Sequence, residues 1–393
     1  MIVAFVTFGC RLNHAEALDL EARFAAAGHV IVNLDDGIPP DAIIVRGCSV
    51  TAKAQHDCEK AILRLQRRHP SAQIIPMGCL PQAIPLPDTF LPSATAENAQ
   101  PPVPLRTSRA YLKIQDGCTC NCAFCIVPRF RGPSVSVPFD QVIARAEAFL
   151  DAGFHELVVT GCNLALYRST GRNGVARLPD VLATLATLRG GHDHRVRLGS
   201  LEPGICDAGL LDAFEAHPNI CRFIHLSLQS ASDAVLARMN RPYRIAAVEA
   251  FCAEARRRLG RHLAFGCDAL AGFPGETADD HQQTCAFLTR HAFTNVHAFP
   301  YSERPGTAGA TLPDALPRNL RLHRARALDA LGRHQRAAFA QTFLDHDVEV
   351  CVEKDGNGWT GEYLPCRLPP GATRRTLVRV RVESVTDDTL VAQ

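Results

Sequence analysis

The sequence predicts an α/β fold in three parts: an amino-terminal parallel α/β domain, a central partial barrel of six βα units, and a small carboxy-terminal β-barrel. Two series of apolar runs alternate with helix-like segments, which is the pattern of parallel strands joined by helical crossovers. From Val348 onward the pattern changes to short β-rich runs. A chain of 393 residues also exceeds what one hydrophobic core usually organises.

Four apolar runs near the start of the chain predict the strands of the first domain. Two amphipathic segments, 13–27 and 52–68, are predicted to be helices between them. The stretch 80–107 is rich in proline and lacks periodicity, which indicates a linker or an irregular domain edge. The predicted strands are 2–7, 29–33, 41–45 and 73–77.

Six strand and helix units after the linker predict the partial (β/α)6 barrel. Their strands are expected at 111–114, 156–160, 195–199, 223–226, 264–269 and 295–299. The tail is predicted to form a small β-barrel whose last strands are 376–383 and 389–391. We therefore expect domains at residues 1–103, 104–342 and 343–393.

Composition narrows the class of protein. Hydrophobic residues make up 47% and charged residues 21%, as in ordinary globular enzymes. We find neither a run of about 18 apolar residues nor a basic leader, so we expect a cytoplasmic protein without a membrane partner. A net charge of +2 gives no global attraction to nucleic acid. Sixteen cysteines without a secretion signal indicate reduced thiols that are available to bind metal.

The strongest motif is a cysteine cluster at the start of the predicted barrel. Cys118, Cys122 and Cys125 have Cys-x-x-x-Cys-x-x-Cys spacing, so one tight loop offers three thiolates. Three thiolates can hold three irons of a 4Fe-4S cluster and leave the fourth iron open. A zinc site is the alternative, but zinc normally closes with four ligands and no second cysteine pair is nearby. Cys120 offers a second register, Cys-x-Cys-x-x-Cys.

Cys10, Cys48 and Cys79 share a second pattern, because each follows a predicted strand of the first domain directly after a glycine. The carboxyl ends of parallel strands meet at one edge, so these three residues are expected to converge on a second cluster. Buried packing is the alternative for any one of them. Cys162 ends a barrel strand and faces the proposed cavity. The remaining cysteines are interpreted as packing residues: Cys58, Cys206, Cys221, Cys252, Cys267, Cys285, Cys351 and Cys366.

Taken together, these motifs resemble the methylthiotransferase family of radical S-adenosylmethionine enzymes over essentially the whole chain. The resemblance rests on residues 7–13, 48–51, 78–79, 118–125, 225–230, 238–241, 272–277 and 299–302. It implies an amino-terminal cluster domain, a radical barrel and a terminal β-barrel of the type called TRAM. Residues 113–118 are most similar to the members that act on N6-threonylcarbamoyladenosine beside the tRNA anticodon.

The resemblance implies two 4Fe-4S clusters and S-adenosylmethionine, with tRNA, an external electron donor and a sulfur donor as partners. Cys118, Cys122 and Cys125 would hold one cluster, Cys10, Cys48 and Cys79 the other, and Cys120 would be a spare, since related enzymes usually have a non-ligand there. The anticodon stem-loop would present the adenine. Candidate cofactor-binding residues are Phe124, Ser200, Glu202, Gln229, Gly272 and Pro300, with Asp268 and Glu276 as weaker candidates.

Three other readings stay open. A sibling modifies isopentenyladenosine in tRNA, another modifies an aspartate of a ribosomal protein, and a non-enzymatic RNA-binding protein stabilised by metal is a reading of another class. The tail has nine acidic residues against six lysines and arginines, yet its arginines are expected to form a basic face. Ala231, Cys162 and the short segment after Cys79 depart from the family pattern, and the last of these suggests a first domain without a terminal strand. The tail arginines that are expected to form the basic face are Arg367, Arg374, Arg375, Arg379 and Arg381.

Overall fold

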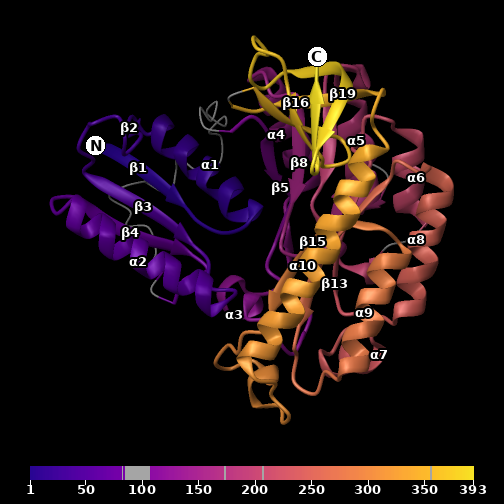
Figure 1. Ribbon diagram of the computed structural model, residues 1–393. Helices are drawn as coiled ribbons and strands as arrows, with labels where there is room; N and C mark the ends of the chain where they lie inside the picture. Colours follow the sequence, from indigo (N-terminus) through magenta and orange to yellow (C-terminus); the bar gives the residue numbers. More distant parts are fainter. Residues whose placement is uncertain (82, 85–106, 172–173, 206–207, 355) are drawn as a thin grey trace.

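A computed structural model describes residues 1–81, 83–84, 107–171, 174–205, 208–354 and 356–393. The amino-terminal domain lies beside the central barrel, and the carboxy-terminal barrel sits at one end of the central one (Figure 1). The expected boundary between residues 103 and 104 and most of the proline-rich stretch lie outside the described residues. None of the helices described is long and apolar enough to cross a membrane.

The amino-terminal domain is a parallel sheet with strand order β2-β1-β3-β4, so the four predicted strands are confirmed. Its two faces are both buried: Phe5 and Ile44 pack with Phe24 on one face, and Ile43 packs with Ile62 on the other. These faces are covered by the two predicted helices. The elements are β1 (Ile2–Thr7), α1 (Arg11–Ala26), β2 (Val30–Val32), β3 (Ala42–Gly47), α2 (Ala52–Arg68) and β4 (Gln73–Gly78).

The central domain has the predicted parallel strands, arranged as two sheets with orders β5-β8-β11 and β12-β13-β14-β15. The predicted strand 195–199 is interrupted: β11 ends before Gly199, and β12 begins directly after it. A Cβ at Gly199 would lie 2.7 Å from the carbonyl oxygen of Val159, so the strands approach closely there. The strands are β5 (Ala110–Lys113), β8 (Glu156–Thr160), β11 (Arg195–Leu198), β12 (Ser200–Leu201), β13 (Phe223–Gln229), β14 (Ala264–Ala271) and β15 (Phe293–Pro300).

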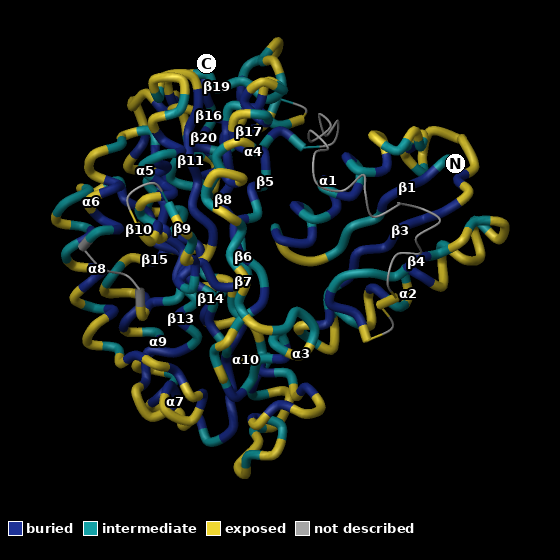
Figure 2. Tube along the Cα trace, turned by 180° about the vertical axis from the view of Figure 1, so that it is seen from behind, coloured by how far each residue is buried: buried dark blue, intermediate teal, exposed yellow. Residues whose placement is uncertain are grey.

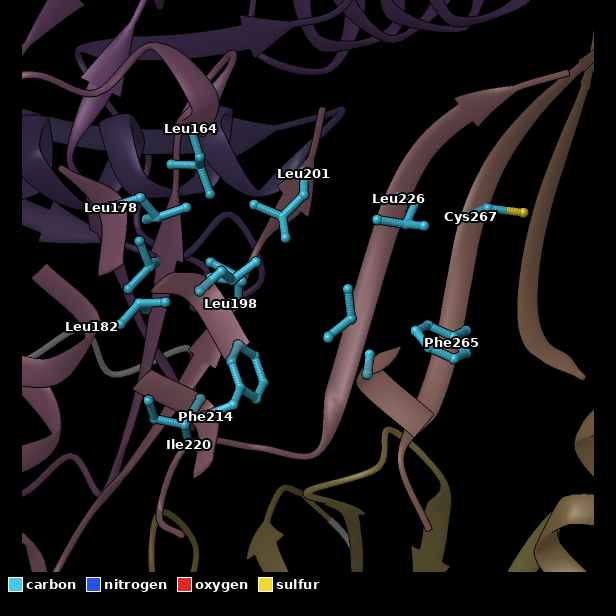
Figure 3. Close-up of a cluster of buried hydrophobic side chains, with 14 of the residues drawn as sticks. Leu164, Leu178, Leu182, Leu198, Leu201, Phe214, Ile220, Leu226, Phe265 and Cys267 are labelled. Atoms are coloured by element: carbon cyan, nitrogen blue, oxygen red, sulfur yellow. The ribbon is translucent and has the colours of Figure 1, made fainter. Parts of the chain in front are cut away.

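Helices cover the outside of this open barrel, and leucines and phenylalanines from strands and helices fill the layer between them (Figures 2 and 3). Two short antiparallel pairs, β6 (Gln115–Asp116) with β7 (Val135–Ser136) and β9 (Ser169–Gly171) with β10 (Gly174–Ala176), had no signal in the sequence. The helices are α3 (Val127–Arg131), α4 (Phe139–Asp151), α5 (Leu178–Thr187), α6 (Ala208–Ala216), α7 (Asp233–Arg238), α8 (Ile245–Leu259), α9 (Ala278–Arg290) and α10 (Arg318–Gln341), with 3-10 turns at 164–166, 188–191, 203–205 and 308–311.

The tail forms the predicted β-barrel, closed in the order β16-β17-β18-β20-β19 around its own apolar core. It docks at the amino ends of the central strands, where buried Arg195 and Arg197 donate to the carbonyls of Trp359 and Thr360, each at 2.7 Å. Both guanidiniums also pair with buried Glu156. The strands are β16 (Asp347–Val352), β17 (Asn357–Thr360), β18 (Pro365–Arg367), β19 (Leu377–Thr386) and β20 (Thr389–Ala392).

Candidate iron-sulfur and substrate site

The central cysteine loop lies between β6 and α3, at the carboxyl ends of the barrel strands. Gly117 is required at its start, because its φ is +65° and a Cβ there would lie 1.9 Å from the carbonyl oxygen of Pro133. The N–H of Ala123 donates to the carbonyl of Met239 at 2.9 Å, and Asn240 Nδ2 donates to the carbonyl of Asn121 at 2.7 Å. The middle of the loop is therefore tied to the residues that follow α7.

A cavity of about 130 Å³ opens in front of this loop. All four loop cysteines and Cys162 line it, so the expectation that Cys162 faces the cavity is confirmed. Burial raises the pKa of Cys125 to about 11 and that of Cys120 to about 12. Because the thiolate is the metal ligand, metal binding here must release protons from these thiols. The other lining residues are Phe124, Asn163, Ser200, Glu202, Ser227, Gln229 and Arg241.

Arg241 organises one wall of the cavity. Its guanidinium donates to Cys122 Sγ at 3.2 Å, to a carboxylate oxygen of Glu202 at 2.8 Å and to the carbonyl of Ser227 at 2.7 Å. The side chains of Arg241 and Glu202 are both almost fully buried. Burial raises the pKa of Glu202, and Arg241 opposes that rise. The wall thus places one cation beside a cysteine of the central loop and keeps a carboxylate facing the cavity.

Asn163 and Cys162 form the wall at the end of β8. Asn163 Nδ2 lies 3.4 Å from Cys120 Sγ and 3.8 Å from Cys118 Sγ. Cys162 Sγ lies 3.4 Å from Asp116 Oδ1. Asn163, Ser227 and Arg241 were not singled out as binding residues from the sequence. A signal for Ser227 and Arg241 was available, since both fall in motifs that carry the family resemblance, and Asn163 directly follows Cys162, which was expected to face the cavity.

The six predicted cofactor-binding residues separate into two groups. Four of them, Phe124, Ser200, Glu202 and Gln229, line the cavity. Gly272 and Pro300 lie instead at the carboxyl ends of β14 and β15 and do not line it. A Cβ at Gly272, whose φ is +76°, would lie 2.5 Å from Cγ of Arg321.

The neighbours of Gly272 and Pro300 support the cysteine loop. Phe273 and Tyr301 pack with Ala123 of that loop in one apolar cluster. Of the weaker candidates, Glu276 pairs with Arg324 at 2.5 Å and accepts the Gly272 N–H at 3.0 Å, which explains its place without a ligand. Asp268 lies on the inner face of the barrel between His225 and His297, at 3.2 and 3.5 Å.

The three cysteines of the first domain lie together at one edge of its sheet, as the topology predicts. Gly9, with φ +98°, would place a Cβ 2.7 Å from Cβ of Cys48, so only glycine fits beside that cysteine. Asn13 Nδ2 donates to the carbonyls of Phe8 and Gly47, both at 2.9 Å, and ties two strand ends together. Burial, with the neighbouring Cys10 and Cys79 thiols, raises the pKa of Cys48 to about 11.

This donor set fits a group that is exposed on one side. Cys10 is exposed, Cys48 is half-buried and Cys79 is buried. Six of the cysteines interpreted as packing residues are buried, which confirms that interpretation for them, whereas Cys285 is half-buried and Cys206 lies outside the described residues. The six are Cys58, Cys221, Cys252, Cys267, Cys351 and Cys366.

A charged network joins the two cysteine sites. Arg131 of α3 donates to Glu16 Oε1 of the first domain at 2.8 Å and to Asp116 Oδ1 of the barrel at 3.0 Å. Glu16 also pairs with Lys113 at 2.7 Å and with Arg46. The cations lower the pKa of Glu16 although its burial acts in the opposite direction. One buried carboxylate therefore holds cations from both domains.

The predicted basic face of the tail is corrected by the structure. Arg374 Nε donates to Ser108 Oγ at 3.0 Å, and Arg375 Nε donates to the carbonyl of Thr107 at 3.2 Å, so both point at the central domain. Arg379 and Arg381 are 77% and 62% exposed, but Asp347 lies 3.5 and 3.6 Å from them. No acid lies between Arg379 and Arg381 in the sequence. In the structure Asp347 lies next to both, because antiparallel pairing places β16 beside β19.

Two family profiles match adjoining parts of the chain. The radical SAM superfamily matches residues 112–288, and an uncharacterized protein family, UPF0004, matches residues 2–91. A radical S-adenosylmethionine methyltransferase from Kitasatospora setae, solved with cobalamin and a 4Fe-4S cluster bound, has a TM-score of 0.54. It is 15% identical, with 79% of this chain and 77% of that chain covered, a likeness of fold alone. The fold and the cysteine loop thus define a radical S-adenosylmethionine enzyme.

Relatives are similar over nearly the full length. A threonylcarbamoyladenosine tRNA methylthiotransferase of Chlamydia pneumoniae is 29% identical, with 99% of this chain and 97% of the relative covered. Its counterpart in Rickettsia prowazekii is 30% identical over 92% and 90%. A tRNA-2-methylthio-N(6)-dimethylallyladenosine synthase of Bordetella pertussis is 31% identical over 88% and 86%. The chain belongs to the methylthiotransferase family of radical S-adenosylmethionine enzymes.

Proposed function

We propose that this enzyme converts N6-threonylcarbamoyladenosine, next to the anticodon of tRNA, to its 2-methylthio derivative. The observation that carries the proposal is the match along 99% of this chain to a relative named for that reaction. Family membership also removes the alternative of a non-enzymatic RNA-binding protein. The reading as an isopentenyladenosine enzyme is the second candidate, favoured by the Bordetella pertussis relative at 31% identity.

The central cavity is the place for radical generation. Cys118, Cys122 and Cys125 would hold a 4Fe-4S cluster with one open iron. When bound there, the cluster and S-adenosylmethionine supply a 5′-deoxyadenosyl radical that can remove a hydrogen atom from substrate. Glu202, Ser227 and Gln229 offer polar groups to the cofactor, as they line the same cavity. Phe124, which belongs to the cysteine loop, lines this cavity as well.

The first domain is proposed to hold a second 4Fe-4S cluster through Cys10, Cys48 and Cys79. This cluster would supply or carry the sulfur, with an external electron donor and a sulfur donor as partners. The exposure of Cys10 supports this role, because a sulfur-carrying group must be accessible to substrate. The Arg131 network supports it too, since it keeps both cysteine sites in one arrangement. We retain the division into residues 1–103, 104–342 and 343–393 for these roles.

The enzyme would bind the tRNA at its anticodon stem-loop. Arg367, Arg379 and Arg381 are the exposed tail arginines and are proposed to contact phosphates. The nearby Asp347 weakens but does not remove this charge, because surface pairs at 3.5 to 3.6 Å are screened by salt. The rival substrate, a ribosomal protein loop, would instead require the acidic residues of the tail to face a basic partner.

Mass spectrometry of tRNA nucleosides from a strain that lacks this gene tests the proposal. We expect the 2-methylthio derivative of threonylcarbamoyladenosine to disappear and its unthiolated precursor to accumulate. A strain complemented with the Cys118→Ala, Cys122→Ala, Cys125→Ala variant should behave like the deletion, because radical generation is lost. Loss of the isopentenyl derivative alone would overturn the proposal in favour of the second candidate. Unchanged tRNA nucleosides would point to the ribosomal protein.

A further inference from the structure

Arg11 links the first cysteine site to the inner face of the barrel. It follows Cys10 directly, and its Nη2 donates to the hydroxyl of Tyr363 in the carboxy-terminal domain at 2.9 Å. The guanidinium also lies over the Tyr363 ring, 5.3 Å from its centroid. A residue beside a proposed cluster ligand therefore reaches across to the far domain.

Tyr363 belongs to an aromatic stack at the amino end of the barrel. Its ring stacks on Trp359 with centroids 4.8 Å apart and on Phe223 with centroids 4.9 Å apart. Its φ is +66°, an uncommon conformation for a bulky residue, so its surroundings fix this position. The stack forms a rigid floor with Arg11 at its edge.

Phe223 places this floor opposite the cofactor cavity. Phe223 and His225 share one face of β13, because a Cβ at Gly266 would lie 2.7 Å from both side chains. Strand alternation puts Ser227 on that face too, and Ser227 lines the cavity. Ser227 lies four residue steps along the strand from Phe223, a span of about 13 Å at roughly 3.3 Å per residue. The aromatic floor and the cavity therefore lie at opposite ends of the inner face of β13.

Arg11 differs from the other guanidiniums around this floor. Arg109 pairs with Glu353 at 2.9 Å and Arg197 pairs with Glu156 at 2.6 Å. In the described part of the chain, Arg11 has a phenol as its partner and forms no ion pair. Burial raises the pKa of Tyr363, but the guanidiniums of Arg11, Arg109 and Arg197 lower it below its ordinary value overall. Among the described residues, Arg11 is thus the guanidinium at this floor that has no carboxylate partner.

We propose that Arg11 binds a carboxylate carried by the N6 substituent of the adenine, and so selects threonylcarbamoyladenosine over adenosines with an apolar substituent. A guanidinium is well suited to this, because its planar fork pairs with both oxygens of a carboxylate. An isopentenyl group offers no partner to the cation. The inference rests on the proposed function, since it names the group by which that substrate is recognised.

The test uses full-length, anaerobically reconstituted enzyme and three anticodon stem-loop RNAs. They carry threonylcarbamoyladenosine, its neutral methyl ester, or isopentenyladenosine. For Arg11→Gln we expect KM for the acid to rise about 10- to 100-fold, the range for a lost hydrogen bond to a charged group, with little change for the ester. Arg11→Lys should fall between, because it keeps the charge but loses the fork. Arg64→Gln, an exposed arginine of α2, is the matched control.

The outcomes separate the two proposals. Failure of the parent enzyme to thiolate the acid RNA overturns the proposed function, and the inference falls with it. An active parent whose Arg11→Gln variant weakens acid, ester and isopentenyl RNAs equally overturns the inference alone, since Arg11 would then grip an RNA phosphate. An Arg11→Gln variant with parental KM for the acid overturns it as well. Iron content equal to the parent's shows that each variant is folded.

Discussion

Arg131 Nε donates a hydrogen bond to Cys79 Sγ at 3.0 Å, so a side chain of the central domain reaches a cysteine of the first domain. Arg241 stands in the same relation to Cys122 of the central loop, at 3.2 Å. Each arginine is also held by carboxylates, Glu16 and Asp116 in one case and Glu202 in the other. Each cysteine site therefore has one fixed cation against one sulfur.

Replacement of Arg131 should change the potential of the proposed first-domain cluster. Hydrogen bonds and positive charge at a cluster sulfur favour the reduced state, so Arg131→Gln should lower the midpoint potential. A lost charge-assisted bond of about 1.4 kcal/mol corresponds to roughly 60 mV for one electron. A redox titration followed by electron paramagnetic resonance measures it. Arg129→Gln on the same helix is the control, because Arg129 contacts a carbonyl, and equal potentials in both variants would contradict the expectation.

Arg241 should contribute both to the cleavage of S-adenosylmethionine and to the stability of the fold, and the two contributions can be measured separately. Arg241→Met leaves buried Glu202 without its cation, which is expected to cost about 3–5 kcal/mol of unfolding free energy. The double variant Arg241→Met, Glu202→Gln should regain most of that stability, since no unpaired charge remains buried. Cleavage of S-adenosylmethionine to 5′-deoxyadenosine should stay at least 10-fold reduced in both variants, because both lack the guanidinium that donates to Cys122 Sγ. Full cleavage in the double variant would show that Arg241 is only structural.

The two cysteine triads should be separable by iron content. Replacing Cys118, Cys122 and Cys125 by alanine should halve the iron and abolish reductive cleavage of S-adenosylmethionine. Replacing the first-domain triad, Cys10, Cys48 and Cys79, should also halve the iron but leave cleavage in place, because the cavity is intact. Cys285→Ala, at a half-buried thiol on α9, is the control and should keep all the iron. A central triple variant with its full iron content would refute the assignment.

Cys120 should be dispensable, because three thiolates suffice for a cluster with one open iron. Its side chain lines the cavity beside the other three cysteines, so exposure to the cavity does not select the register. Cys120→Ala should keep the iron and the cleavage activity of the parent enzyme. Cys118→Ala should lose the cleavage activity and half of the iron, and the pair of variants compares the two possible registers directly. A Cys120→Ala protein without its central iron would reverse the choice.

Much of the fold could be predicted because the positions of most strands and helices depend on the local sequence. The helix 52–68 has the predicted bounds, and Thr51 caps it by accepting the Ala54 N–H at 3.1 Å, a signal readable in the sequence. The break at Gly199 could not be predicted, because it depends on the approach of Val159 from another strand. The partners of Arg374 and Arg379 depend in the same way on domain docking and strand pairing.

In the candidate site, too, features set by the local sequence could be predicted, and features set by packing between distant segments could not. The spacing of Cys118, Cys122 and Cys125 predicted that they share one loop, and the glycine and strand end before Cys10, Cys48 and Cys79 predicted that these three converge. The structure brings each triad together. Arg131, Arg241 and Arg11 were not predicted, because their sulfur and aromatic partners lie 52, 119 and 352 positions away. Long side chains reach such partners only once the domains are packed. Gly272 and Pro300 were placed at the correct strand ends, but their neighbours support the loop instead of lining the cavity.

The tail arginines should now divide into two sets when tRNA binding is measured across a salt series. Arg367, Arg379 and Arg381 are exposed, so changing all three to glutamine should flatten the salt slope by roughly one unit for each phosphate that is no longer neutralised. Arg374 and Arg375 bond to the central domain, so their replacement should lower thermal stability while leaving the slope nearly unchanged.

Asp347→Asn is the matched variant that should strengthen tRNA binding. It is measured by filter binding across the same salt series. It removes the acid beside Arg379 and Arg381, so affinity for tRNA should rise at low salt and the slope should steepen. If the substrate were a ribosomal protein loop, the same change would weaken binding of that basic partner, and the triple arginine variant would have little effect. Opposite signs for one substitution therefore separate the two substrates. Parental tRNA affinity in both variants would remove the tail from substrate recognition.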